Sequence, residues 1–147
     1  MKQSLLIGLI FLLIFSSCQK NNDSHEINGS WKLAEVFDKT TNTVNYPPAG
    51  SNMNIVITFL DANKFAGHTF RNTLTDGNYT QSGNEIFFKN FSMTRIGEDQ
   101  FGESFLSVLY ACSLQSAVPC SPSKVSIQGN LMKIMTPLRY DITLRRL

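Results

Sequence analysis

Apolar and polar positions alternate along much of the chain from residue 29 onward. In residues 54–60 an isoleucine or phenylalanine occupies every second position, and in residues 140–146 three apolar residues alternate with Asp, Thr and Arg. A period of two sends successive side chains to opposite faces of an extended chain. These segments therefore predict strands that bury one face and leave the other in water.

Turn signals separate the predicted strands. Ser82-Gly83-Asn84 lies between two such segments, and Gly129-Asn130 lies between two more. Because Gly and Asn tolerate positive φ, both stretches predict hairpins. Residues 40–52 are expected to form a long loop, since Pro47 and Pro48 cannot donate to a strand ladder.

One segment has a helical period instead. Phe101, Phe105, Leu106 and Leu109 fall at i, i+4, i+5 and i+8, and the two acidic residues 98–99 would complement the helix dipole. Strands precede and follow this segment. The pattern predicts a mainly β (α+β) fold, a small antiparallel barrel-like sheet with one helix packed at its end.

The first 17 residues have the layout of a secretory signal peptide. A charged start containing Lys2 is followed by about eleven apolar residues, from Leu5 to Phe15, and then by two serines. The apolar run is shorter than the ~20 residues that a membrane-spanning helix needs. Residues 1–17 are therefore expected to be removed.

Cys18 follows directly after these small residues, as in the lipobox of bacterial lipoproteins. The match departs at Phe15, where an aliphatic residue is usual. We expect Cys18 to carry lipid, residues 18–27 to form a polar tether, and residues 28–147 to form one domain. Since several acyl chains hold a protein on a bilayer, the predicted location is the bacterial cell envelope, at the outer membrane.

Two further cysteines, Cys112 and Cys120, form an even pair in a chain expected to be exported. An oxidising compartment favours a disulfide between them. The alternative is a two-cysteine metal site, which lacks partners because no histidine lies nearby and the spacing is not C-x-x-C. The disulfide is the prediction that we adopt.

Charge and motifs exclude several classes of function. Removing Lys2 with the signal peptide lowers the formal charge from +2 to +1, which leaves no electrostatic footprint for nucleic acid. His25 lies in the tether and His68 stands alone in a predicted strand, so no two-histidine metal site forms in the domain. Motifs for a nucleophilic serine or a phosphate loop do not occur. We expect no enzymatic activity, no cofactor and no metal.

The middle of the chain is rich in phenylalanine. Phe87 and Phe88 are adjacent and would point to opposite faces of a strand, so the helix or a partner must cover one of them. We regard this pair as a candidate binding surface. An apolar ligand cavity is the alternative, although a barrel of eight strands is just wide enough for its own side chains.

Several stretches together resemble the META domain, the family of HslJ-like heat-inducible lipoproteins. They are, in order, NGSWKL, ITFLDANKFAG, DGNY, IFFKNFSMTR, GESFLSVL and IQGNLMKIM with DITL, and they cover nearly all of residues 27–147. The resemblance implies a small β-rich fold in an envelope protein, without established catalytic residues. The Gly29-x-Trp31 opening also resembles lipocalins, but lipocalins place their helix after the last barrel strand.

The chain departs from the META pattern at two places. Family members often carry a cysteine at each, and these cysteines look like a bridging pair. Here the matching positions hold His68-Thr69 and Gly97-Glu98, so the resemblance implies that packing replaces the bridge.

The predicted function is that of a membrane-anchored lipoprotein whose domain acts through contacts with an envelope protein, with a link to stress. One alternative is a lipocalin-like carrier of a small apolar ligand. Another is an inhibitor of a secreted hydrolase that presents the loop between Cys112 and Cys120, because a bridged loop loses less entropy on binding.

Overall fold

The computed structural model describes residues 27–48, 54–111 and 121–147. The signal peptide, Cys18 and the pair Cys112 and Cys120 lie outside the described residues. The elements in chain order are β1 (Gly29–Asp38), β2 (Thr43–Asn45), β3 (Val56–Leu60), the 3₁₀ turn η2 (Asp61–Asn63), β4 (Lys64–His68), β5 (Thr73–Ser82), β6 (Glu85–Met93), α1 (Gln100–Tyr110), β7 (Ser123–Gln128), β8 (Leu131–Met135) and β9 (Tyr140–Arg146).

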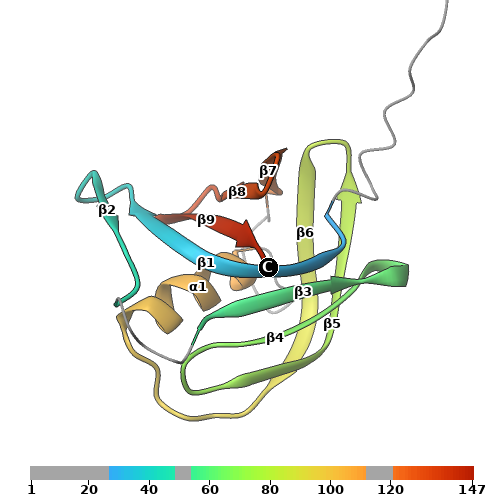
Figure 1. Ribbon diagram of the computed structural model, residues 1–147, viewed down its shortest axis with the longest axis horizontal. Coiled ribbons are helices and arrows are strands. Elements are labelled where there is room, and N and C mark those ends of the chain that lie inside the picture. Colours follow the sequence, from blue (N-terminus) through green and yellow to red (C-terminus); the bar gives the residue numbers. More distant parts are fainter. Residues whose placement is uncertain (1–26, 49–53, 112–120) are drawn as a thin grey trace, which may run out of the picture.

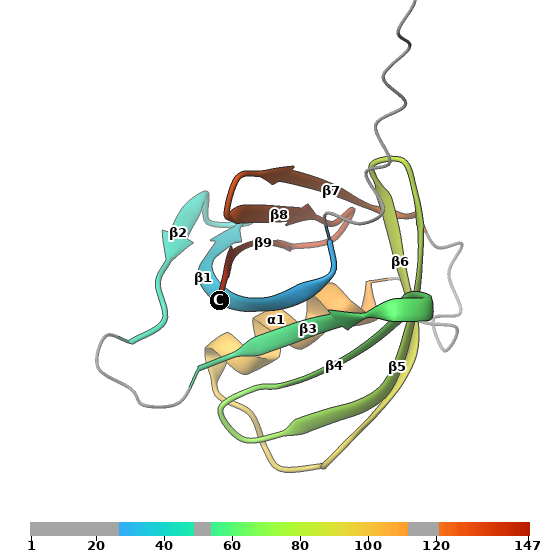
Figure 2. The same cartoon turned by 45° about the vertical axis from the view of Figure 1, so that its right-hand side comes forward.

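The sheet closes into an antiparallel barrel of eight strands. From β3 to β9 each strand pairs with the next along the chain, and β9 pairs with β1, which also pairs with β3. β2 is an appendage that pairs with the second half of β1. Figures 1 and 2 show the first strand (blue) and the last strand (red) side by side. The predicted barrel-like sheet is confirmed.

In residues 54–60 the period of two correctly identified which side chains face inward. Ile55, Ile57 and Phe59 are all at most 2% exposed. Both predicted hairpin turns are present, with Gly83 and Gly129 at φ of 57° and 59°. Such positive φ values cost a residue with a Cβ more than they cost glycine.

Two irregularities shift the alternation in the middle of the sheet. In β5 the register slips beside Asp76, whose φ is 54°, so that Leu74 and Gly77 both face inward. In β6 the register slips between Phe88 and Asn90. The inward-facing residues change there from even-numbered to odd-numbered positions, which brings Phe91 against the core. These are β-bulges, which bend a strand and help a sheet to curve closed.

The helix α1 packs against the inner side of the barrel at one end, next to β9 and β1. Asp99 caps it by accepting from the backbone N–H groups of Phe101 and Gly102 at 2.8 and 2.9 Å. Phe105 and Leu109 are fully buried in the core, as the helical stripe predicts. Within the described residues, no helix has the length and apolar character to cross a membrane.

Gly29 and Trp31 close the barrel where the described domain begins. Gly29 has a φ of 118°, and the Trp31 indole is fully buried and donates from Nε1 to the Ile27 carbonyl at 2.7 Å. Arg146 of β9 covers the outer face of this indole. The first and last strands are thereby held together by a side chain as well as by their backbone pairing.

Two details differ from the sequence-based expectations. The stretch 40–52, expected to be a loop, contains the short strand β2, because the residues before Pro47 still carry the N–H groups that pairing needs. Asp141, expected on the wet face of the last strand, is 8% exposed. Lys39 explains its burial, since its Nζ reaches the Asp141 carboxylate at 3.0 Å.

Candidate functional site on the outer face of the barrel

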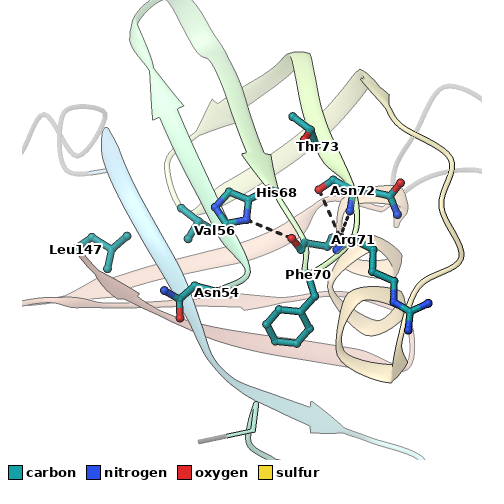
Figure 3. Close-up of a pocket in the computed structure, with 9 residues that line it drawn as sticks. Asn54, Val56, His68, Phe70, Arg71, Asn72, Thr73 and Leu147 are labelled. Carbon is teal, nitrogen blue, oxygen red and sulfur yellow. Dashed lines mark hydrogen bonds between the residues drawn. The ribbon is translucent and has the colours of Figure 1, made fainter. Parts of the chain in front are cut away.

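An open pocket of about 590 Å³ lies on the outer face of β3, β4 and β5 (Figure 3). Val56, His68 and Thr73 stand opposite one another on these three strands and point away from the barrel interior. The pocket is lined by Asn54, Val56, His68, Thr69, Phe70, Arg71, Asn72, Thr73 and Leu147. Its volume lies within the range of pockets that bind small molecules or single side chains.

His68, the last residue of β4, lies near the middle of this surface. In Figure 3 it stands beside Val56, with Leu147 on one side and Arg71 on the other. Its Nδ1 lies 3.2 Å from the Thr69 carbonyl oxygen. A carbonyl oxygen only accepts, so Nδ1 carries the hydrogen in this contact and Nε2 remains to face the pocket or the solvent.

A hydrogen-bonded turn at residues 69–72 forms one wall. The Thr69 hydroxyl oxygen accepts from the backbone N–H groups of Arg71 and Asn72, at 3.2 and 2.8 Å, and donates to Glu98 Oε1 at 2.5 Å. The wall is thus fixed to the segment that leads into α1.

Asn72, which is 1% exposed, is the centre of this connection. Its Oδ1 accepts from the Ile96 backbone at 2.8 Å and from the Thr94 hydroxyl at 3.0 Å. Its Nδ2 donates to the Ile96 carbonyl and to Glu98 Oε1. Since all these groups are occupied, Asn72 shapes the pocket rather than offering itself to a ligand.

The positions where the META resemblance implied a bridging pair are in contact here. Thr69 and Glu98 meet through the hydrogen bond between their side chains, and Arg71 donates to the Gly97 carbonyl at 2.9 Å. The expectation that packing replaces the bridge therefore needs correction, because hydrogen bonds join these two segments.

Arg71 gives the pocket a positive charge. Its side chain donates to the Gly97 carbonyl but forms no ion pair with a carboxylate of the described residues, and none of the nine lining side chains is acidic. Val56, Phe70 and Leu147 supply apolar surface, and Leu147 is 70% exposed. The arrangement suits a group with an apolar body and a negatively charged or hydrogen-bond-accepting end.

The structure separates the two phenylalanines of the candidate binding surface. Phe87 lies half-buried on the outer face of β6. Phe88 is 1% exposed and contacts Phe59 and Phe65, with ring centroids 6.3 and 5.4 Å apart. The assignment of Phe88 to a surface is therefore corrected, because the strand alternation directs its ring into the core.

Aromatic side chains pack against one another inside the barrel, where a carrier would hold its ligand. Phe59 packs edge-on against Tyr79 at 5.1 Å, and Phe65 packs against Phe91 at 5.8 Å. Phe105 of α1 is fully buried in the same cluster. These rings contact one another, which is the arrangement expected of an ordinary core.

The remaining site residues proposed from sequence, namely Cys18, Cys112 and Cys120, lie outside the described residues. Among the residues that are described, no cluster of three or more His, Cys, Asp or Glu side chains could hold a metal ion. Arg71, Asn54 and Leu147 were not identified from the sequence. The signal that could have pointed to Arg71 is a cation between two predicted strands with no acidic residue close to it in the chain.

The architecture defines a small up-and-down barrel with one internal helix, and solved structures share it. No family model and no curated protein matches the chain. An NMR structure of a protein from Burkholderia xenovorans has a TM-score of 0.60 and 16% identity, covering 85% of this chain and 86% of that one. A crystal structure of a DUF4847 family protein from Bacteroides vulgatus has a TM-score of 0.56 and 13% identity, covering 84% and 95%. At such identities the likeness shows the fold alone.

Proposed function

We propose that this protein is a lipid-anchored envelope protein whose barrel domain binds a protein partner through the pocket at His68 and Arg71. One observation carries the proposal. The barrel interior is occupied by its own aromatic side chains, whereas the open pocket lies on the outer face and has a cation without an acidic partner. The anchor itself rests on the sequence of residues 1–18.

The pocket would receive one anchoring side chain or chain end of the partner. An apolar group would contact Val56 and Leu147 while a carboxylate met Arg71. Protein interfaces commonly concentrate their binding energy in such a few well-packed contacts, surrounded by weaker ones. The hydrogen bonds around Asn72 hold the wall in place before binding, which lowers the entropy lost on association.

A lipocalin-like carrier is the second candidate, because closed barrels of eight strands can hold one small ligand. The Gly29-x-Trp31 opening and the closed topology support it. Binding of a protein partner at the outer pocket is favoured instead, because Phe59, Phe65 and Phe88 contact one another where a carrier would hold its ligand.

A photo-crosslinking residue in place of His68 tests the proposal in cells. A discrete adduct is expected from position 68, and it should be lost when Arg71→Glu is added. Two controls use Lys89, which is exposed on the outer face of β6. In the first, the photo-crosslinking residue replaces Lys89 instead of His68. In the second, the crosslinker stays at position 68 and Lys89→Glu replaces Arg71→Glu, which should leave the adduct unchanged. The same set of adducts from both positions, or none from position 68, would contradict the proposal.

A further inference from the structure

A second outer surface carries an excess of positive charge. Four basic residues point outward from neighbouring strands β7, β8, β9 and β1, and we call them the basic strip: Lys124, Lys133, Arg145 and Lys32. Their neighbours on the same face include Ser126, opposite Lys133, and Leu131, opposite Arg145. Figure 2 shows β7, β8 and β9 stacked together on one side of the barrel.

Arg145 and Lys32 stand directly opposite each other on β9 and β1. Two like charges at such positions destabilise a sheet, because their Cβ atoms are only about 5 Å apart. No residue of the basic strip forms an ion pair with a carboxylate of the described residues. Glu85, opposite Lys124, and Glu35, opposite Thr143, form no ion pair with the strip but offset part of its charge, so that four cations face two carboxylates.

Two cations elsewhere in the described domain are paired with carboxylates. Arg139 is held by Asp38, and Lys39 by Asp141, on the far part of the same two strands. The four residues of the basic strip form no such pair with a described residue, as is also true of Lys64 and Lys89, but only the strip gathers its cations on neighbouring strands. An external anion would supply the missing compensation.

One end of the basic strip, at Lys32 and Arg145, lies where the chain enters the domain. Lys32 is three residues beyond Gly29, and Arg146, next to Arg145, donates from Nη1 to the Asn28 carbonyl at 2.8 Å. A tether of residues 18–27 would extend by at most about 35 Å. A lipid at Cys18 would therefore keep this end of the barrel, and with it Lys32 and Arg145, near the membrane.

From this placement we infer that the basic strip binds the anionic phospholipid surface to which the chain is anchored. The orientation of the strip toward the membrane rests on the proposed anchor, whereas the attraction of its cations to anionic lipid does not. Each cation near an anionic surface strengthens binding roughly fivefold, and the attraction falls off within a Debye length of ~8 Å at physiological salt. Lys32 also lies opposite Val56, so the pocket would sit at the margin of the membrane contact.

Lysine footprinting on the lipidated protein tests this orientation. The protein is reconstituted in vesicles of phosphatidylcholine, with or without phosphatidylglycerol, and acylated with a water-soluble reagent. On the anionic vesicles, modification of Lys124 and Lys133 should slow several-fold and recover at high salt. Lys64 and Lys89, on β4 and β6, serve as internal controls and should react equally on both vesicles. If each of the four lysines is modified at the same rate on both kinds of vesicle, the inference is overturned.

A second measurement separates failure of the strip from failure of the anchor. The mature chain carrying Cys18→Ser should still cosediment with vesicles containing phosphatidylglycerol and not with phosphatidylcholine alone. Lys133→Gln with Arg145→Gln should weaken this binding roughly fivefold for each charge removed. The control pair Lys64→Gln with Lys89→Gln removes the same charge elsewhere and should have little effect. Equal losses in both pairs would mean that net charge, not the strip, governs binding.

Discussion

The guanidinium carbon of Arg146 lies 4.2 Å from the centre of the Trp31 ring. This contact joins the last strand to the first, and the same guanidinium donates to the Asn28 carbonyl. A cation above an indole is attracted by the negative face of the ring. The backbone pairing that closes the barrel is thus supplemented by a side chain that comes 115 positions later in the chain than its partner.

Arg146→Ala should lower the free energy of unfolding by about 1–3 kcal/mol, because it removes the cation above the ring and a hydrogen bond to a backbone carbonyl. Arg145→Ala is the matched control. Its side chain points outward opposite Lys32, so its loss should cost little and could relieve repulsion. Urea denaturation of both variants measures the difference. Equal losses would show that the contact with Trp31 contributes nothing.

Gly77 leaves room for an aromatic ring in the core. A Cβ there would lie 2.6 Å from the ring and from the carbonyl oxygen of Phe65. Gly77→Ala should therefore destabilise the fold by about 1–3 kcal/mol through overpacking. Gly97→Ala, which places its Cβ in open space, should stay within about 0.5 kcal/mol of the parent protein. Thermal unfolding of the pair checks the prediction, and an unchanged Gly77→Ala would contradict this packing.

Asp38 should make stability depend on pH in the acid range. Its hydrogen bonds from Arg139 lower the pKa of the carboxyl from 3.8 to about 2. A carboxyl with a lowered folded-state pKa stabilises the fold above the unfolded value and loses that contribution as pH falls through the folded value.

The difference in stability between the parent protein and Asp38→Asn should accordingly be full above pH 3.8 and fade as pH falls to about 2. Denaturation midpoints measured across this range provide the test. In an Arg139→Gln background most of the pH dependence should disappear, because the arginine is its main cause. If the Arg139→Gln variant keeps the full pH dependence of stability, a group other than the Asp38–Arg139 pair causes it.

Asn72 connects the turn at residues 69–72 to the segment before α1. Asn72→Ala should destabilise the protein by about 2–4 kcal/mol, since it leaves the Ile96 N–H and carbonyl without a partner and removes one of the two hydrogen bonds to Glu98 Oε1. Asn90→Ala, on an exposed position of β6, is the control. Hydrogen exchange at the Ile96 amide should accelerate only in the first variant. If exchange there is unchanged, the connection does not depend on Asn72.

Much of the barrel could be predicted because its signals are local. The inward positions of residues 54–60, the two glycine turns and the stripe of α1 all follow from periodicity, and each is confirmed. The bulge between Phe88 and Asn90 was not predicted, although the consecutive polar residues Lys89 and Asn90 interrupt the alternation there, because the extra apolar residue Phe87 obscures the change of phase. Phe91 reaches the core for this reason alone.

The pocket was harder to predict for a different reason. Its wall depends on Thr69 and Asn72 meeting Glu98, which lies 26 to 29 residues further along the chain. Single-sequence patterns do not report which polar side chains meet across such a distance. Burial of Asp141 beneath Lys39 depends on the same kind of contact, over 102 residues. The anchor at Cys18, by contrast, is a local motif and remains a prediction from sequence.

The intact mass of the protein from its native membrane fraction, before and after reduction and thiol alkylation, tests the central claim of an anchored binding domain most directly. We predict a mature chain that begins at Cys18 and carries added acyl mass, with two alkylations that appear only after reduction. An unlipidated mass would contradict the anchored protein, and free thiols before reduction would contradict the bridge between Cys112 and Cys120.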